Sequence, residues 1–464
     1  MPYNYTFVTE FFKYKTMRMK FIFALVSLLL CSHFMGNAQT MVEVKASDSH
    51  IQYMGRIDNS NPDNVVFAYP GVSIRAQFEG TRIDAMLVEG GSGAETTTNY
   101  FNVIVDGGTP TVLKLSASQT EYTVASGLAD GTHTIELFKR TESLVGKVTF
   151  KGFKLEEGKS LLTPQALPNR KMMFVGNSIT CGYGNEISTT TPDNYHFTSV
   201  NENNYKAWGA VTARNLNAQY HCIAYSGRGL YRNNNGSQAG TAPVFFDQTI
   251  ADDASLVWDH SKYIPDVVVI NLGTNDFSAE VASSAYTVDE TTFVNTYLDF
   301  VAKIRTDYPN ANIICAVGVM MNDYYPSGKK HWTRIQNYVQ KVVSTRNMGG
   351  DKNVFYFKME PQQSPYGEDW HPTTKTDSIM AANLTAFIKT LANPKNCNAA
   401  ISLGRDKSTI GETFPLTIDS KGTTGEGKTF SWYKNGTVLG GQNGATLALP
   451  SAGDAVGTFK VTMD

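Results

Sequence analysis

The residues whose types could support catalysis fall in four short segments, each of which follows an apolar run. These segments are Gly176-Asn177-Ser178, Tyr225-Ser226-Gly227-Arg228-Gly229, Gly273-Thr274-Asn275-Asp276 and Asp369-Trp370-His371-Pro372. Each segment alone has an ordinary structural explanation, because a serine after a strand often caps a helix and Gly- or Asx-rich segments often form turns. Together they hold a hydroxyl, an imidazole, a carboxylate and several N–H donors, which is the set of groups that acyl transfer requires.

Acyl transfer to a serine gives each of these groups a role. Ser178 is a weak nucleophile until a base removes its proton, and His371 is the candidate base. Asp369 lies two residues before His371, so in an extended loop the carboxylate can point the same way as the imidazole and orient it. The amides of Ser178 and Gly227 and the side chain of Asn275 are the candidate oxyanion donors. Losing one such donor typically costs about 2.7–4 kcal/mol of transition-state stabilisation.

Apolar segments alternate with helical stretches across residues 170–392. The expected strands are 172–175, 220–224, 267–272, 313–319 and 354–357. Apolar side chains recur at helical spacing twice between them, at Phe293, Tyr297, Phe300, Val301 and Ile304 and again at Ile335, Tyr338, Val339 and Val342. This alternation predicts a parallel sheet with helices on both faces and an active site beyond the carboxyl ends of its strands.

Two further regions flank this α/β region. Residues 41–160 contain many short segments in which Val, Ile, Phe and Tyr alternate with polar residues between turns, which predicts a β-sandwich or jelly roll. A linker with Pro164 and Pro168 follows, and the α/β domain is expected over 168–393. Residues 398–464 resemble a small immunoglobulin-like β module that is shorter than usual, and a complete and an incomplete module both stay open as alternatives.

The N-terminus and the composition indicate an exported globular protein. Residues 1–38 combine basic residues, the apolar run 21–30 and the small residues of Gly36-Asn37-Ala38, as a cleaved secretory signal does. The remaining cysteines are Cys181, Cys222, Cys315 and Cys397. They are too few for a disulfide framework, and buried free thiols are favoured over one bridge. A net charge of −2 favours neither nucleic acid nor an anionic membrane as a partner.

The four polar segments, in this order, resemble the conserved blocks of the SGNH (GDSL-like) hydrolases. That resemblance covers about residues 170–392 and implies a flavodoxin-like α/β/α domain. With the preceding β-sandwich, the stretch 178–186 and Asp-Trp-His-Pro at 369–372, the chain is similar to carbohydrate esterase family 2 over residues 41–392. The family resemblance implies removal of O-acetyl groups from plant cell-wall polysaccharides such as xylan and glucomannan.

The same resemblance assigns the site residues. It implies Ser178 as nucleophile, His371 as base, Asp369 as its partner, and Gly227 and Asn275 in the oxyanion hole. Trp370 is expected to line the sugar or acetyl pocket. Many members carry Asp where this chain has Asn177, a departure expected to tune activity without abolishing it.

We therefore expect a serine esterase that acts on an acetylated polysaccharide or oligosaccharide through an acyl-enzyme. Two alternatives stay open: a lipase or esterase for other acyl esters, and a non-catalytic glycan-binding or adhesion protein. No cofactor and no metal are expected, since no His-Glu-x-x-His, Cys-x-x-Cys or Gly-rich phosphate loop occurs. The polar stretch 185–204 is expected to be a solvated insertion more readily than a substrate-facing loop.

Overall fold

The computed structural model describes residues 40–391 and six short strands between 399 and 463. The expected signal segment, residues 1–38, and Cys397 lie outside the described residues. The C-terminal strands are β17 (Ala399–Leu403), β18 (Phe414–Ser420), β19 (Phe430–Lys434), β20 (Thr437–Val438), β21 (Thr446–Leu449) and β22 (Phe459–Met463). They pair in two antiparallel sheets of three strands, and the expected immunoglobulin-like module stays a prediction.

Alternating side chains build the N-terminal β-sandwich, as the sequence predicts. Its strands are β1 (Met41–Lys45), β2 (Gln52–Met54), β3 (Val65–Phe67), β4 (Ser73–Gly80), β5 (Ile83–Glu89), β6 (Tyr100–Val105), β7 (Thr111–Lys114), β8 (Glu121–Ala125), β9 (Gly131–Lys139), β10 (Val148–Glu156) and β11 (Leu161–Leu162). In β4, Ile74, Ala76 and Phe78 are buried at every second position. One antiparallel sheet has the order β1-β10-β5-β8 with β3 on β10, and the other has the order β11-β4-β9-β6-β7 with β2 on β4.

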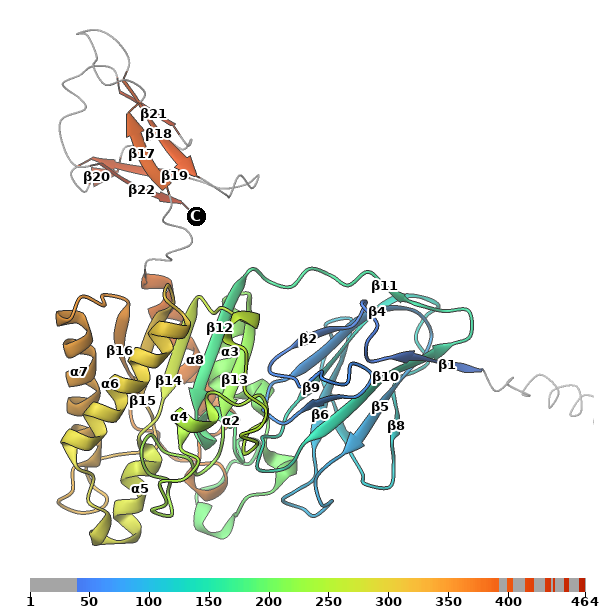
Figure 1. Cartoon of the computed structure of the whole chain (residues 1–464), viewed down its shortest axis with the longest axis horizontal. Coiled ribbons are helices and arrows are strands. Elements are labelled where there is room, and N and C mark those ends of the chain that lie inside the picture. Colours follow the sequence, from blue (N-terminus) through green and yellow to red (C-terminus); the bar gives the residue numbers. More distant parts are fainter. Residues whose placement is uncertain are drawn as a thin grey trace, which may run out of the picture.

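The second domain is a parallel five-stranded sheet between two helical layers (Figure 1). Its strands are β12 (Arg170–Gly176), β13 (Ala218–Ala224), β14 (Val267–Asn271), β15 (Asn312–Val317) and β16 (Val354–Lys358). Their order in the sheet is β13-β12-β14-β15-β16, the flavodoxin-like order. Every residue of β14 and β15 is buried, as a sheet covered on both faces requires. The fold expected from strand and helix spacing is confirmed.

Helices cover the two faces of this sheet. The α-helices are α2 (Ser178–Cys181), α3 (Trp208–Asn215), α4 (Ala242–Phe245), α5 (Thr274–Ala282), α6 (Glu290–Asp307), α7 (His331–Met348) and α8 (Thr374–Thr390). Trp208 of α3 and Leu384 of α8 share a core with Phe174 of β12, whereas Phe293 of α6 and Val339 of α7 share the other core with Val175. The helix pairs α3–α8 and α6–α7 therefore lie on opposite faces.

Short 3₁₀ helices occur in the loops. They are η1 (Pro192–Asn194), η2 (Ser199–Asn201), η3 (Asn204–Lys206), η4 (His260–Lys262), η5 (Ser284–Tyr286) and η6 (Glu368–Trp370). Cys181, Cys222 and Cys315 are buried free thiols, the favoured of the two expectations. Among the described residues, no helix has both the length and the apolar character that crossing a bilayer requires.

The β-sandwich and the α/β domain share a buried junction. Phe138 at the end of β9 packs edge-on against Tyr205 at a ring-centroid distance of 5.1 Å and stacks on Tyr220 at 6.4 Å. Arg56 of the sandwich is fully buried, and its Nη1 donates to the carbonyls of Phe246 and Gln248 at 2.6 and 2.8 Å. A buried cation with partners in the other domain fixes how the two domains meet.

Candidate active site

Ser178 lies just beyond the carboxyl end of β12, which is the second strand in the order of the sheet. It is also the point at which α2 begins. The helix cap is Asn177, whose side chain accepts a hydrogen bond from the Ile179 amide at 3.2 Å. Ser178 is thus the first residue of the helix, where a backbone N–H has no intrahelical acceptor. A Cβ at Gly176 would lie 2.1 Å from Thr180 Oγ1, so this tight turn requires glycine.

His371 meets Ser178 from the far end of the sheet. Its Nε2 lies 2.7 Å from Ser178 Oγ, and its Nδ1 lies 2.9 Å from the backbone carbonyl of Glu368. A carbonyl only accepts, so Nδ1 carries the proton and the Nε2 lone pair faces the serine hydroxyl. Burial lowers the pKa of His371 to about 4 against a smaller opposing effect of the Glu368 hydrogen bond, so the imidazole is neutral at pH 7. A neutral imidazole on a serine hydroxyl is the arrangement of a general base.

The expected pairing of Asp369 with the second imidazole nitrogen is wrong. Residues 368–370 form the turn η6 with Asp369 at φ 47°, so the loop is not extended as that pairing requires. The Asp369 carboxylate instead accepts from Tyr183 Oη at 2.7 Å, from His196 Nδ1 at 2.8 Å and from the Phe197 amide at 3.2 Å. Burial alone would raise the pKa of Asp369, but the hydrogen bonds from Tyr183 and His196 outweigh it and hold that pKa below its usual value.

Tyr183 links Asp369 to the His371 imidazole without a direct carboxylate contact. Its ring stacks on that of His371 with centroids 4.0 Å apart and an interplanar angle of 27°, and its hydroxyl donates to Asp369. Phe197 packs on the other side of this arrangement, 4.4 Å from the Tyr183 ring. Asp369 therefore positions the tyrosine that covers one face of His371.

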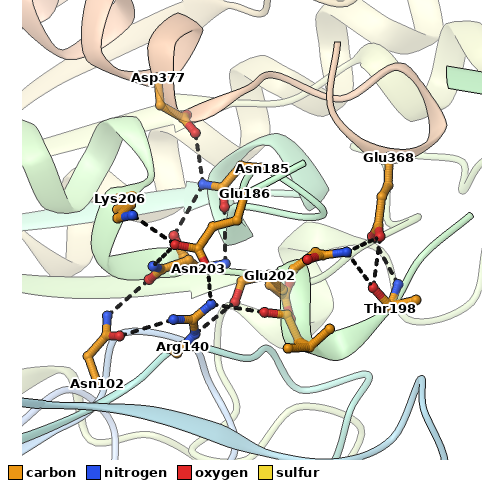
Figure 2. A network of polar contacts seen from close by, with 12 residues as sticks. Asn102, Arg140, Asn185, Glu186, Thr198, Glu202, Asn203, Lys206, Glu368 and Asp377 are labelled. Carbon is orange, nitrogen blue, oxygen red and sulfur yellow. Dashed lines mark hydrogen bonds and ion pairs between the residues drawn. The ribbon is translucent and has the colours of Figure 1, made fainter. Parts of the chain in front are cut away.

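Glu368 fixes the carbonyl that orients His371. Its buried side chain accepts hydrogen bonds from the Thr198 amide at 2.9 Å, from Thr198 Oγ1 at 2.7 Å and from Asn201 Nδ2 at 2.7 Å (Figure 2). Its own amide donates to the Gly184 carbonyl at 3.2 Å. The contacts of the Glu368 side chain and of its amide together hold the backbone of this residue in place. Sequence reasoning missed this residue, because a backbone carbonyl as orienting group has no residue signature.

The expected solvated insertion at 185–204 is confirmed only in part: most residues from 188 to 196 are exposed, whereas the two ends of the stretch are buried and bind neighbouring elements. The residues of this stretch that are buried include Asn185, Ser199, Glu202, Asn203 and Asn204. Asn185 Nδ2 donates to the Asp377 carboxylate of α8 at 2.9 Å, and Asn203 Oδ1 accepts from Asn102 of the sandwich at 3.1 Å (Figure 2). A run of asparagines reads as solvated in sequence, although here their amides satisfy buried backbone and carboxylate groups.

The candidate oxyanion donors lie at the ends of β13 and β14. Gly227 has φ +75°, a left-handed conformation that favours glycine, and within the described part of the chain its N–H makes no hydrogen bond. Asn275 Nδ2 donates one of its two hydrogens to the Arg228 carbonyl at 2.7 Å. The fold thus brings Ser178, Gly227 and Asn275 to adjacent strand ends of one sheet, while their oxyanion role stays a prediction.

Asp276 holds the segment that follows Gly227. It is completely buried, and its carboxylate accepts from the backbone amides of Leu230, Tyr231 and Arg232 at 2.8, 2.9 and 3.0 Å. Burial raises the pKa of Asp276 to about 6, and these three amides oppose that rise. The Gly-Thr-Asn-Asp segment therefore supplies both a candidate oxyanion donor and an anchor for the neighbouring loop.

Trp370 lies at the surface and directly precedes His371 in the chain. Its side chain is 48% exposed, at φ +60°, and its carbonyl accepts from Gln362 Nε2. An exposed indole next to a buried dyad is suited to stacking on a sugar ring, and its place in the substrate pocket stays a prediction. Trp208 is by contrast fully buried against Phe174 in the core.

Two clusters of described residues have metal-ligand types, and their surroundings disfavour a cation. Glu142, Cys181 and Glu202 are buried with their ligand atoms within 4.8 Å of one another, and burial raises all three pKa values, which favours the protonated forms. The second cluster is Asp247, His260 and Asp307. Lys303 Nζ lies 2.8 Å from one of its carboxylates and 3.4 Å from the other, which places an ammonium group where a metal would bind.

The fold and the site define a serine hydrolase of the SGNH class, and the comparisons name the family. Residues 53–164 match the carbohydrate esterase 2 N-terminal family model, and residues 174–378 match the GDSL-like lipase/acylhydrolase family. An acetylxylan esterase / glucomannan deacetylase of Cellvibrio japonicus is 30% identical over 380 residues, which cover 80% of this chain and 99% of the relative. The chain belongs to carbohydrate esterase family 2 and is a carboxylic ester hydrolase.

Other relatives agree in sequence and in structure. The cellulase/esterase CelE of Acetivibrio thermocellus is 40% identical over 342 residues, which are 73% of this chain but only 39% of that longer protein. A family two carbohydrate esterase from Clostridium thermocellum, solved in complex with cellohexaose, has a TM-score of 0.66 and 39% identity over 73% of this chain and 98% of that one. A family two esterase from Cellvibrio japonicus has the same TM-score at 30% identity, over 76% of this chain and 98% of that one.

Proposed function

We propose that this protein is an exported esterase that removes O-acetyl groups from plant cell-wall polysaccharides such as xylan and glucomannan. The observation that carries the proposal is the 2.7 Å contact between Ser178 Oγ and the neutral His371 Nε2. It stands at the strand ends where Gly227 and Asn275 also lie. The names of the Cellvibrio relatives, which are acetylxylan esterases and glucomannan deacetylases, support acetylated glycans as the substrate class.

The reaction runs in two halves on these residues. Ser178 Oγ attacks the acetyl carbonyl as His371 Nε2 takes the hydroxyl proton, and the Glu368 carbonyl holds the protonated ring in place. The amides of Ser178 and Gly227 and the free hydrogen of Asn275 Nδ2 bind the oxyanion. His371 then gives its proton to the sugar oxygen as the bond between that oxygen and the acyl carbon breaks; the sugar departs with a free hydroxyl, and an acetyl-serine remains. Water activated by His371 releases acetate and restores Ser178.

Substrate recognition is proposed for the exposed surface beside the dyad. Trp370 offers an indole face next to His371, and the cellohexaose complex of a 39%-identical relative supports a β-linked glucan chain as a ligand of such a site. Residues 1–38, as a cleaved secretory signal, would deliver the protein to its extracellular substrate. The periplasm, the cell surface and the medium are all compatible with that signal.

Acetate release from acetylated glucomannan and acetylated xylan tests the proposal. Wild type should release acetate from at least one of them, and Ser178→Ala should reduce the rate on the order of 10⁴-fold or more. Equal, slow release by both proteins together with retained polysaccharide binding would establish a non-catalytic glycan-binding protein. Activity confined to long-chain acyl esters would establish a lipase-type esterase.

A further inference from the structure

One buried acidic residue of the sandwich domain, Glu142, lies beside the loop that carries the candidate oxyanion donor Gly227. Glu142 follows β9 in the segment Lys139-Arg140-Thr141-Glu142, in which each residue is at most 2% exposed. Charged residues are seldom this deeply buried unless their charges are compensated or neutralised. This segment leaves the sandwich and enters the junction with the α/β domain.

The Glu142 carboxylate binds Ser226, the residue directly before Gly227. One oxygen accepts from the Ser226 amide at 2.7 Å, and the other forms a short hydrogen bond with Ser226 Oγ. Ser226 is itself only 9% exposed and lies two residues after the end of β13. The N–H and the hydroxyl of Ser226 are therefore both bound by a side chain from the other domain, 84 residues earlier in the chain.

Glu142 is itself held on several sides. Glu202 Oε2 accepts from the Glu142 amide at 2.9 Å, and Lys139 Nζ donates to the Glu142 carbonyl at 3.3 Å. Arg140 donates to the Glu202 carbonyl at 3.3 Å and to Asn102 at 3.2 Å, in the network of Figure 2. This scaffold fixes the position of the Glu142 carboxylate.

The other contact of this acidic cluster is the nucleophile helix. Cys181, the last residue of α2, places its sulfur within 4.8 Å of carboxylate oxygens of Glu142 and Glu202. Glu142 therefore lies between the end of the helix that starts with Ser178 and the start of the loop that carries Gly227. A carboxylate at this place couples the two halves of the candidate oxyanion hole.

We propose that Glu142 is a positioning residue for catalysis: by binding Ser226 N–H and Oγ, it sets the Gly227 amide toward the oxyanion. The inference rests on the proposed esterase function. An oxyanion donor acts mainly in the transition state, so its displacement lowers kcat and leaves KM nearly unchanged. A misplacement of about 1 Å can cost about 10²-fold in rate.

The experiment compares Glu142→Ala with Glu142→Gln and with the junction control Glu186→Gln. Glu186 is bound to Arg140, Lys206 and Asn203 at the same junction, and within the described residues it makes no hydrogen bond or ion pair with Ser226 or Gly227. On 4-nitrophenyl acetate, Glu142→Ala should lower kcat by about 10²-fold with KM within about threefold. Glu142→Gln, which keeps an acceptor for the Ser226 amide, should recover most of that loss, and Glu186→Gln should stay within about threefold of wild type. A Glu142→Ala kcat no lower than that of Glu186→Gln overturns the inference.

A second measurement separates this inference from the proposed function. Hydrogen exchange of residues 225–230 should be faster in Glu142→Ala and unchanged in Glu186→Gln, whatever the substrate. If wild type and Ser178→Ala hydrolyse the ester equally, the esterase function fails, and the exchange result still decides the position of the loop. Unchanged exchange in Glu142→Ala overturns the inference. If Glu142→Ala does not fold, Ser226→Ala takes its place, and a wild-type kcat in that variant overturns it.

Discussion

The proton on His371 Nδ1 points to a peptide carbonyl. The Glu368 carbonyl fixes the tautomer and the ring orientation, as the acid of a Ser-His-Asp triad does, but it brings only a partial negative charge to the imidazolium. The Asp369 carboxylate acts on His371 only indirectly, through Tyr183, whose ring stacks on the imidazole. We therefore propose that the reacting unit is a Ser178–His371 dyad with a backbone acceptor.

The Asp369→Asn variant tests this assignment. Where a carboxylate bonds the imidazole directly, its replacement by Asn lowers kcat by about 10⁴-fold. Here Asp369→Asn should reduce kcat by less than about tenfold, because the Glu368 carbonyl keeps the Nδ1 proton in place. His371→Ala, measured beside it on 4-nitrophenyl acetate, should lose nearly all activity. A loss in Asp369→Asn as large as in His371→Ala would show that the carboxylate orients the base directly.

The pKa of His371 predicts the acid limb of the pH–rate profile. Burial lowers this pKa to about 4, so the imidazole stays neutral and able to accept a proton well below the ordinary value of 6.5. As pH falls through the lowered pKa, His371 becomes protonated and the rate falls. The kcat/KM profile, which reports the free enzyme, should therefore keep its plateau through pH 6. An acid limb centred at or above pH 6.5 would contradict the buried, neutral imidazole.

For individual site residues, the sequence predicts some contacts and misses others. Ser178, Gly227, Asn275 and His371 could be found because their segments follow strands of one parallel sheet, which brings strand ends together. The place of Asp369 could not be found, because it depends on a left-handed turn at that residue. Glu142 gave no signal either, since its partner Ser226 comes from another domain.

Among the elements, the turn η6 and the segment 185–206 act as one unit. The Glu368 side chain joins them through Thr198 and Asn201 (Figure 2), and the same residue offers the carbonyl that orients His371. Because this connection is rigid, the packing of segment 185–206 determines the position of the Glu368 carbonyl and so the orientation of His371. The apolar periodicity that identifies helices α6 and α7 gives no information about such a turn, because its order comes from polar contacts.

Glu368→Gln tests the connection. Three donors, Thr198 N, Thr198 Oγ1 and Asn201 Nδ2, face this carboxylate, so either orientation of a Gln amide sets its NH₂ against a donor. The variant should lose about 1–3 kcal/mol of stability and about tenfold in kcat. Urea unfolding and ester kinetics measure both. Glu360→Gln, at an exposed residue paired with Lys358, is the matched control, and equal behaviour of the two variants would refute the connection.

For the whole molecule, the buried junction makes the sandwich part of the enzyme's scaffold. The sequence predicts both domains and the linker between them, but it does not predict the contacts that join the two domains. Arg56, Phe138 and Arg140 read in sequence as unremarkable strand and turn residues, and their partners in the α/β domain lie 46 or more residues away. Long-range pairs of this kind have no periodicity, so the extent of the junction emerges only in three dimensions.

Phe138→Ala tests whether the two domains unfold together. Removal of this buried ring, which packs on Tyr205 and Tyr220, should cost about 3–5 kcal/mol. Calorimetry should show one transition for the sandwich and the α/β domain, shifted as a whole to lower temperature. Val112→Ala, at a position 56% exposed on β7, should leave the temperature of that transition unchanged. Two separate transitions, with the α/β domain unaffected by Phe138→Ala, would show that the domains are independent.

Covalent trapping of the nucleophile tests the central claim most directly. A fluorophosphonate that mimics an ester should label wild type once, on the peptide that contains Ser178, and abolish acetate release from acetylated glycan in proportion to labelling. The reagent requires a serine activated by a neighbouring base, so Ser178→Ala should take up none and His371→Ala very little. Label on a different residue with proportional loss of acetate release, or wild-type acetate release by Ser178→Ala, would contradict the account.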